Sequence, residues 1–206
     1  MTRRGGRRHG LKGGYNGTYQ KLQRTNNMIC PWWLCYSFDN PLRRIFHKPE
    51  SLLDPYLKPG MSAVDIGCGM GYFTLGLAKL AGPEGRVIAV DLQQQMLDAL
   101  ERRARGAGVA DRIALHRCRK ESLGVEGPVD FALAFWMAHE VPDKPRFFRE
   151  IFALLKTGGR LLLVEPKFHV TLRSFERTLA VCREAGFRDL EGPAIALSRA
   201  ALMGKE

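Results

Sequence analysis

The stretch "AVDIGCGMGYFTLGLA", residues 63–78, joins a short apolar run to a segment with the composition of a helix. Three glycines, Gly67, Gly69 and Gly71, alternate across the junction, shortly after the acidic residue Asp65. Glycine permits a sharp turn and lets the backbone approach a ligand where a Cβ atom would collide. An ordinary strand-to-helix connection needs one flexible residue, so three predict a loop that holds a nucleotide-type cofactor.

Apolar runs and helical stretches alternate after residue 58, which predicts an open, doubly wound parallel sheet of the α/β class. Each predicted strand is a nearly continuous apolar run, typical of strands covered on both faces. Glycines near several helix ends support the boundaries. The predicted strands cover 62–67, 86–91, 112–117, 129–135 and 159–165, and the predicted helices cover 72–81, 93–106, 143–156 and 171–186.

The last 21 residues, "GFRDLEGPAIALSRAALMGKE", depart from this alternation. They are expected to form two strands joined by a short Gly-Pro turn, without room for a crossover helix, so the strands should pair antiparallel. Dinucleotide dehydrogenases normally end in parallel strands. The predicted hairpin therefore argues against a nicotinamide enzyme.

A second acidic residue, Asp91, ends the second predicted strand, twenty residues after Gly71. A carboxylate at this place can accept both hydroxyls of a ribose. The alternative is a cap for the helix predicted over 93–106. Because Tyr72 follows Gly71, the loop has the spacing Gly-x-Gly-x-Gly and not the dinucleotide pattern Gly-x-Gly-x-x-Gly. The combination favours a ribose-containing cofactor.

These residues resemble a known family. "DIGCGMG" (65–71), followed by "VD" (90–91), is similar to the cofactor motifs of class I S-adenosylmethionine-dependent methyltransferases. "LLKTGGRLLLVEP" (154–166) resembles the segment around that family's fifth strand. The resemblance covers roughly 58–203 and is closest to the small-molecule branch with the ubiquinone/menaquinone-biosynthesis-type methyltransferases. It implies a Rossmann-like, doubly wound seven-stranded sheet with an antiparallel C-terminal hairpin, and S-adenosyl-L-methionine as cofactor, converted to S-adenosyl-L-homocysteine.

The resemblance also implies particular cofactor contacts. The glycine loop is expected along the methionine and ribose portion, with Asp65 near the methionine amine and Asp91 at the ribose hydroxyls. Many members have an acidic residue for the adenine amino group, but here that segment is "HRCRKESL", in which Cys118 occupies the position and leaves a backbone carbonyl or Glu121 to make the contact. For Met96, the alternative is burial on the inner face of a helix. The expected cofactor contacts are Asp65, Gly67, Cys68, Gly69, Gly71, Asp91, Leu92, Met96, Cys118 and Trp136.

The end of the fourth predicted strand, "AFWMAHEVPDK" (134–144), carries the candidate catalytic residues His139 and Glu140. Methyl transfer is an in-line displacement, so a base is needed only if the acceptor must lose a proton. Histidine suits that role near neutral pH, although His139 has a structural role in capping the sheet as its alternative. Glu165 ends the fifth predicted strand and is a candidate substrate contact, with His169 close behind.

Several motifs of related enzymes are absent from the sequence. The Asn/Asp-Pro-Pro-Tyr/Phe motif of base-amine methyltransferases and the Pro-Cys motif of cytosine-C5 enzymes do not occur after the fourth predicted strand. No carboxylate-rich magnesium site or zinc-ligand spacing is evident, so no metal is expected. Five scattered cysteines do not suggest a disulfide framework, and they favour a reducing, cytoplasmic setting.

The segment before the sheet divides into two predicted parts, 1–27 and 28–58, ahead of a cofactor-binding domain over 59–206. The second part contains "CPWWLCYSFDNPLRRIF", in which Trp32, Trp33 and Tyr36 are candidate substrate contacts. Such a cap could wall an apolar pocket, and aromatic residues beside arginines also suit peripheral contact with a membrane. Ordinary packing against the sheet is the alternative.

The first 27 residues hold seven of the 32 lysines and arginines and no acidic residue, in a chain of net charge +11. They are predicted to be a disordered extension that binds polyanions weakly and without specificity, or that is dispensable. The leading hypothesis is methylation of a small, apolar acceptor such as a quinone precursor, thiol or lipid. The alternatives are an RNA or protein methyltransferase that uses the basic extension, and a noncatalytic S-adenosylmethionine-binding partner; the oligomeric state is left open.

Overall fold

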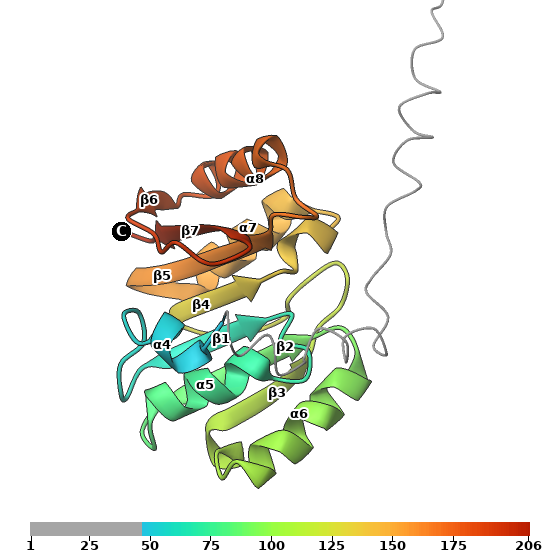
Figure 1. Cartoon of the computed structure of the whole chain (residues 1–206), viewed down its shortest axis with the longest axis vertical. Coiled ribbons are helices and arrows are strands. Elements are labelled where there is room, and N and C mark those ends of the chain that lie inside the picture. The colour runs from blue at the N-terminus through green and yellow to red at the C-terminus, as the bar shows by residue number, and fades with distance from the viewer. Residues whose placement is uncertain (1–46) are drawn as a thin grey trace, which may run out of the picture.

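The computed structural model describes residues 47–206. The candidate contacts Trp32, Trp33 and Tyr36 and the predicted basic extension lie outside the described residues. The described elements appear in Figure 1. In chain order they are α4 (Pro49–Leu53), β1 (Ser62–Ile66), α5 (Tyr72–Ala81), β2 (Arg86–Asp91), α6 (Gln94–Gly106), η1 (Ala110–Arg112), β3 (Ile113–Arg117), β4 (Val129–Phe135), η2 (Ala138–Glu140), α7 (Lys144–Leu154), β5 (Leu155–Pro166), α8 (Leu172–Glu184), β6 (Arg188–Leu190) and β7 (Ser198–Gly204).

The seven strands form one sheet in the order β3-β2-β1-β4-β5-β7-β6. The pairs from β3 to β5 are parallel, whereas β7 runs antiparallel to both β5 and β6. The strand order reverses between β1 and β4, and Ile66 at the end of β1 is level with Val90 of β2 and Ala134 of β4. The carboxyl ends of these strands therefore meet at the switch point where such sheets bind ligands. The predicted fold class is confirmed.

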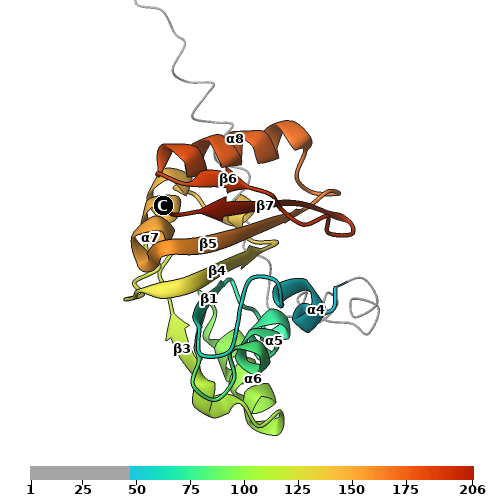
Figure 2. The same ribbon diagram turned by 90° about the vertical axis from the view of Figure 1, so that its left-hand side faces the viewer.

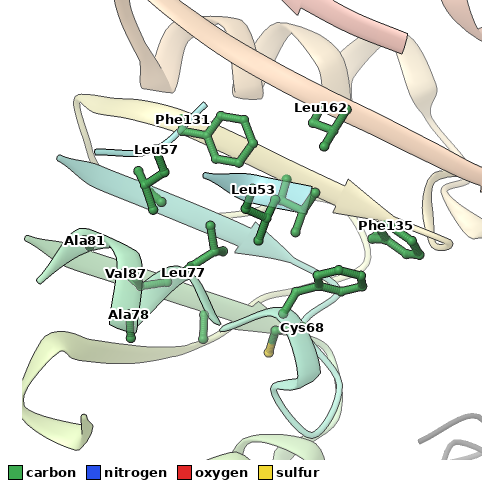
Figure 3. Close-up of a cluster of buried hydrophobic side chains, with 14 of the residues drawn as sticks. Leu53, Leu57, Cys68, Leu77, Ala78, Ala81, Val87, Phe131, Phe135 and Leu162 are labelled. Atoms are coloured by element: carbon green, nitrogen blue, oxygen red, sulfur yellow. The ribbon is translucent and has the colours of Figure 1, made fainter. Parts of the chain in front are cut away.

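Helices cover both faces of the sheet (Figures 1 and 2). Alternate residues of the central strands enter different cores: Phe131 and Leu133 of β4 pack with α4, α5 and α6, while Ala132 and Ala134 pack with α7 and α8. Figure 3 shows the first of these cores, with Phe131, Leu77 and Leu53 directed toward one another. Burial on both faces explains why the strands read as continuous apolar runs.

The connection between β6 and β7 differs from the predicted short turn. It runs over residues 191–197, and β7 lies between β5 and β6 in the sheet. Ile195 of the connection is buried in the first core, and Leu197, with a φ of 58°, accepts a hydrogen bond from Lys167 N at 2.9 Å. The Gly-Pro pair lies in a longer connection that packs back onto the domain, so the predicted short turn was wrong, while the predicted antiparallel pairing of the two strands is confirmed.

The described residues ahead of β1 pack against α5. Pro49 of α4 occupies the space beside Gly76, where a Cβ atom would lie 2.6 Å from Pro49 Cβ. His47 is 2 % exposed, and its backbone oxygen accepts a hydrogen bond from the Tyr72 hydroxyl at 2.5 Å. Its ring makes edge-on contacts with those of Phe135 and Trp136, both at 5.4 Å between centroids. The chain thus enters the described fold beside the carboxyl end of β4.

Candidate active site

The three glycines of the β1–α5 loop all have positive φ angles, each in a different environment. A Cβ atom on Gly67 would lie 2.8 Å from Met137 Cγ, and one on Gly71 would overlap Leu100 of α6. A Cβ atom on Gly69 would meet no atom within 4 Å. Gly67 and Gly71 are therefore required by the protein's own packing, while the face of Gly69 is open to a ligand.

Asp91 joins this loop to the next one. Its carboxylate accepts hydrogen bonds from the backbone N–H of Gly69 and from that of Gln93, each at 2.9 Å. Gln93 is the N-cap of α6 and its own side chain makes no cap hydrogen bond; the Asp91 carboxylate binds the N–H of this N-cap residue, so its alternative role at the start of the helix is met in part. Burial raises the pKa of Asp91, and the backbone N–H groups of Gln93, Gly69 and Leu92 oppose that rise. The carboxylate is thus held in a fixed orientation at the end of β2.

Asp65 lies in the buried layer beneath the loop. It is 2 % exposed and accepts a hydrogen bond from the Thr74 hydroxyl at 2.5 Å. The backbone N–H groups of Gly67 and Cys68 donate to Val90 O at 2.8 and 3.0 Å, which holds the loop against β2. Cys68 is also buried, and this burial raises the pKa of its thiol well above the usual range.

A cavity with a volume of about 210 Å³ opens where the carboxyl ends of β1 and β2 meet the segments after β3 and β4. Asp65, Cys68, Gly71, His139 and Glu165 are not among its lining residues. The predicted site residues that line it are Gly67, Gly69, Asp91, Leu92, Met96, Cys118, Trp136 and Glu140. One space thus connects the predicted cofactor loop with residues at the end of β4.

The segment after β3 supplies the wall near Asp91. Cys118 N donates to the backbone oxygen of Asp91 at 3.0 Å, and Glu121 lines the cavity as well. Burial, reinforced by the nearby Asp91 carboxylate, raises the pKa of the Cys118 thiol to about 11. The thiol is therefore largely protonated at physiological pH and lacks the negative charge of the acidic residue that many family members carry here.

Trp136 is the first residue after β4, in a backbone conformation with a φ of 59° that is uncommon outside glycine. Its N–H donates to Val164 O at 2.7 Å, and its indole N–H donates to the Ser198 hydroxyl at 3.0 Å. The indole also meets the ring of Phe168 edge-on at 5.6 Å. These partners from β5, β7 and the β5–α8 loop fix the indole at the wall of the cavity.

His139 is bound through two of its atoms by one carboxylate. Glu165 accepts a hydrogen bond from His139 N at 2.9 Å and lies 2.5 Å from its ring nitrogen Nδ1. Glu165 is 2 % exposed, whereas the His139 side chain is 19 % exposed. Glu140, the other candidate catalytic residue, has its Oε1 3.9 Å from His139 Nε2, which is beyond hydrogen-bond range. The oriented pair is therefore His139 with Glu165.

Two further groups surround this pair. The His169 ring lies 4.8 Å from the His139 ring, centroid to centroid. Lys144 Nζ donates to Ala138 O at 2.5 Å. Burial lowers the pKa of Lys144, and the opposite charge of Glu165 counteracts that effect.

Sequence reasoning did not identify several residues of the site. Thr74 is a helix residue whose hydroxyl is committed to Asp65, and no local pattern distinguishes it. Phe147 follows the 3.6-residue periodicity of α7, so its burial was predictable but its place at the cavity was not. The lining residues missed in this way include Gln93, Met137, Val141, Phe147 and Glu150.

Over residues 47–206, no group of three or more His, Cys, Asp or Glu side chains is placed to hold a metal ion. Across that same part of the chain, no helix combines the length and apolar character needed to cross a membrane.

The strand order, the glycine loop after β1 and the carboxylate that ends β2 define a class I methyltransferase fold with a site for S-adenosylmethionine. The chain belongs to the methyltransferase-domain family, whose sequence model matches residues 57–188. The resemblance of the sequence to class I methyltransferases, and the S-adenosylmethionine cofactor that it implied, are therefore confirmed. The open face of Gly69 and the preset Asp91 carboxylate fit the ribose-bearing cofactor of this class.

Individual relatives match over part of their length. The demethylmenaquinone methyltransferase of Lactobacillus johnsonii is 33% identical over 110 residues, which is 53% of this chain and 45% of that protein. The ubiquinone/menaquinone biosynthesis C-methyltransferase UbiE of Pasteurella multocida is 31% identical over 110 residues, 53% of this chain and 41% of that protein. The match thus spans less than half the length of these curated relatives.

A solved structure supports the fold across most of the chain. The crystal structure of a SAM-dependent methyltransferase from Aquifex aeolicus superimposes with a TM-score of 0.73 at 21% sequence identity. The superposition covers 84% of this chain and 96% of that one. At this identity the likeness establishes the shared fold, and the residues of this chain must carry any argument about its substrate.

Proposed function

We propose that this protein transfers a methyl group from S-adenosylmethionine to a small, apolar acceptor. One observation carries the proposal: a single cavity is lined both by the cofactor-type residues Gly69 and Asp91 and by the aromatic residues Trp136 and Phe147. A cofactor and an acceptor could therefore meet in one cavity. The names of the relatives, which concern demethylmenaquinone and ubiquinone/menaquinone biosynthesis, support a quinone precursor as the acceptor class.

The residues of this chain would act mainly by positioning. Bound S-adenosylmethionine supplies an electrophilic methyl group on a sulfonium. Asp91 would accept the two ribose hydroxyls, and the open face of Gly69 would let the cofactor lie against the backbone. Trp136 would form the wall against which the acceptor is aligned. Because the displacement is in line, correct alignment of two bound molecules contributes much of the rate.

The surface beside Trp136 supports an apolar acceptor. Phe168, which meets the Trp136 ring, is 69 % exposed, and Leu197 is 53 % exposed. The two lie close together, because Lys167 N donates to Leu197 O. Exposed apolar side chains next to a site commonly mark where an apolar ligand or surface makes contact. We therefore include peripheral contact with a lipid surface, through which a lipid-like acceptor could arrive, in the proposal.

A cytoplasmic location is part of the same proposal. Cys68, Cys118 and Cys182 are free thiols in the described structure, and free thiols persist best in reducing compartments.

The test follows a radiolabelled methyl group from S-adenosylmethionine into an extract of the source cells, with full-length and 28–206 protein compared. We expect label in the organic-solvent fraction with both proteins. Label in RNA or protein that disappears with residues 1–27 would establish the alternative of a macromolecular substrate. Cofactor binding without labelling of any fraction would instead favour a noncatalytic partner.

A further inference from the structure

The segment after β3 makes a tight turn at the wall of the cavity. Arg119 and Ser122 pair through both of their backbone N–H groups, at 3.1 and 3.3 Å, so residues 119–122 form a closed turn. All four residues of this turn line the cavity. The residue before the turn, Cys118, donates its N–H to Asp91 O at 3.0 Å. The turn therefore starts beside the residue expected to hold the ribose, and the adenine of the cofactor is attached to that ribose.

One carboxylate from a different part of the chain holds this turn. Glu150 of α7 accepts hydrogen bonds through Oε2 from Leu123 N at 2.7 Å and from the Ser122 hydroxyl at 3.2 Å. Its Oε1 accepts from Arg146 Nε at 2.9 Å, one helical turn earlier, which fixes the direction of the carboxylate. Glu150 is the sole acidic residue in the sequence of α7, and it also lines the cavity. The contact thus connects α7 to the turn after β3 at the cavity itself.

The turn depends strongly on this carboxylate. Leu123 is 7 % exposed, and a donor in a buried residue is costly to leave unpaired. The neighbouring contacts do not replace Glu150, because Leu123 O is bound to His116 Nε2 at 2.9 Å and the Ser122 hydroxyl oxygen accepts from Gly124 N at 3.1 Å. Removal of the carboxylate should therefore move the turn until Leu123 N finds another acceptor.

The geometry points to Glu150 as a positioning residue that holds the turn of residues 119–122 against the adenine of bound S-adenosylmethionine, and so sets the preference of the site for that base. This inference deepens the proposed function and rests on its cofactor site, not on the acceptor. The adenine amino group is a donor, and the turn offers it the Glu121 carboxylate and backbone oxygens as acceptors. The Cys118 thiol carries no charge that could serve instead, because burial raises its pKa to about 11.

The test compares two ligands that differ only in the base, and it needs no acceptor. The ligands are S-adenosylhomocysteine and S-inosylhomocysteine, which has an oxygen where adenine has its amino group. Calorimetry should show that the full-length wild type prefers the adenosyl ligand. In Glu150→Ala, affinity for the adenosyl ligand should fall about tenfold, with little change for the inosyl ligand, because only the former loses a hydrogen bond.

Two further variants separate positioning from stability. Glu150→Gln keeps an oxygen that can accept from Leu123 N, so it should restore the preference for adenine. Arg149→Ala, which changes an exposed residue of the same helix, is the matched control and should behave as the wild type. An equal loss of affinity for both ligands in Glu150→Ala would overturn the inference, as would an unchanged preference.

Should Glu150→Ala fail to fold, Ser122→Ala decides the question. It removes one of the two contacts with the carboxylate, so it should lower the preference in the same direction, and a full preference would overturn the inference. Failure of the proposed function is a separate result. A wild type that prefers the adenosyl ligand but methylates nothing refutes methyl transfer and leaves the role of Glu150 intact, whereas a wild type that binds neither ligand refutes both.

Discussion

At the scale of single residues, Asp91 and Gly69 depend on each other. The carboxylate ends β2 and accepts the Gly69 N–H, so the residue expected to bind ribose also shapes the loop expected to pass beneath the cofactor. Spacing in the sequence predicted both residues, because a glycine loop and a strand-end carboxylate twenty residues later form a local pattern. The contact between Glu165 and His139 was not predictable in this way. Glu165 ends β5 and His139 follows β4, and the two meet only because these strands pair in the sheet.

We expect Asp91→Ala to weaken S-adenosylmethionine binding. Two charge-assisted hydrogen bonds to the ribose would be lost, each worth roughly 1.5–3 kcal/mol, so affinity should fall about 100-fold or more. Isothermal titration calorimetry measures the change. Asp98→Ala, which removes a carboxylate from the exposed side of α6, is the matched control and should bind normally. Unchanged affinity in Asp91→Ala would refute the ribose assignment.

The raised pKa of Cys118 predicts how its alkylation depends on pH. With a pKa of about 11, roughly one thiol in 10⁴ is ionised at pH 7, and the thiolate fraction rises tenfold with each pH unit below that value. Site-resolved mass spectrometry should therefore find slow labelling by iodoacetamide at pH 7 and a steep increase up to pH 9.5. Since Cys118 lines the cavity, S-adenosylmethionine should slow the labelling. Labelling at pH 7 as fast as that of an unstructured peptide cysteine would contradict the assignment.

At the scale of helices and strands, the limits of β1 to β4 were predictable almost to the residue, whereas β5 begins at Leu155, four residues before its predicted start and within the helix predicted over 143–156. The strands from β1 to β4 are short apolar runs, and their predicted limits differ from the observed ones by at most one residue. For β6 and β7, the sequence predicted the antiparallel direction of the strands but not their order in the sheet. The place of β7 between β5 and β6 depends on pairing with a strand more than 30 residues earlier, which no local period encodes.

The contact of α4 with α5 gives a prediction for Gly76. A Cβ atom there would lie 2.6 Å from Pro49 Cβ, so Gly76→Ala should force the helices apart and lower the free energy of unfolding by about 1–3 kcal/mol. Chemical denaturation measures the loss. Gly106→Ala in α6 is the matched control, because its Cβ would meet no atom within 4 Å. Helix propensity predicts a neutral or slightly stabilising effect for that control. Equal stability of the two variants would show that α4 does not press on α5.

At the scale of the whole molecule, charge is concentrated at one end of the chain. Removal of residues 1–27 deletes seven of the 32 basic residues and none of the 21 acidic ones, so the net charge falls from +11 to +4. We expect the shortened protein to transfer methyl groups to a small acceptor at the full-length rate. Its binding to a random RNA should be weaker, with a smaller dependence on salt concentration. A loss of transfer to a small acceptor would mean that residues 1–27 serve the reaction itself.

The position of β7 in the sheet bears on how the protein is made. As the chain leaves the ribosome, β1 to β5 can pair in parallel, but β5 then presents an open edge, because β6 emerges next and pairs with β7 alone. That edge stays uncovered until residues 198–204 have been synthesised, and unpaired strand edges invite association with other chains. The Ser198 hydroxyl that holds the Trp136 indole arrives with the same residues. Closure of the sheet and completion of the active-site wall are therefore a single late event in biosynthesis.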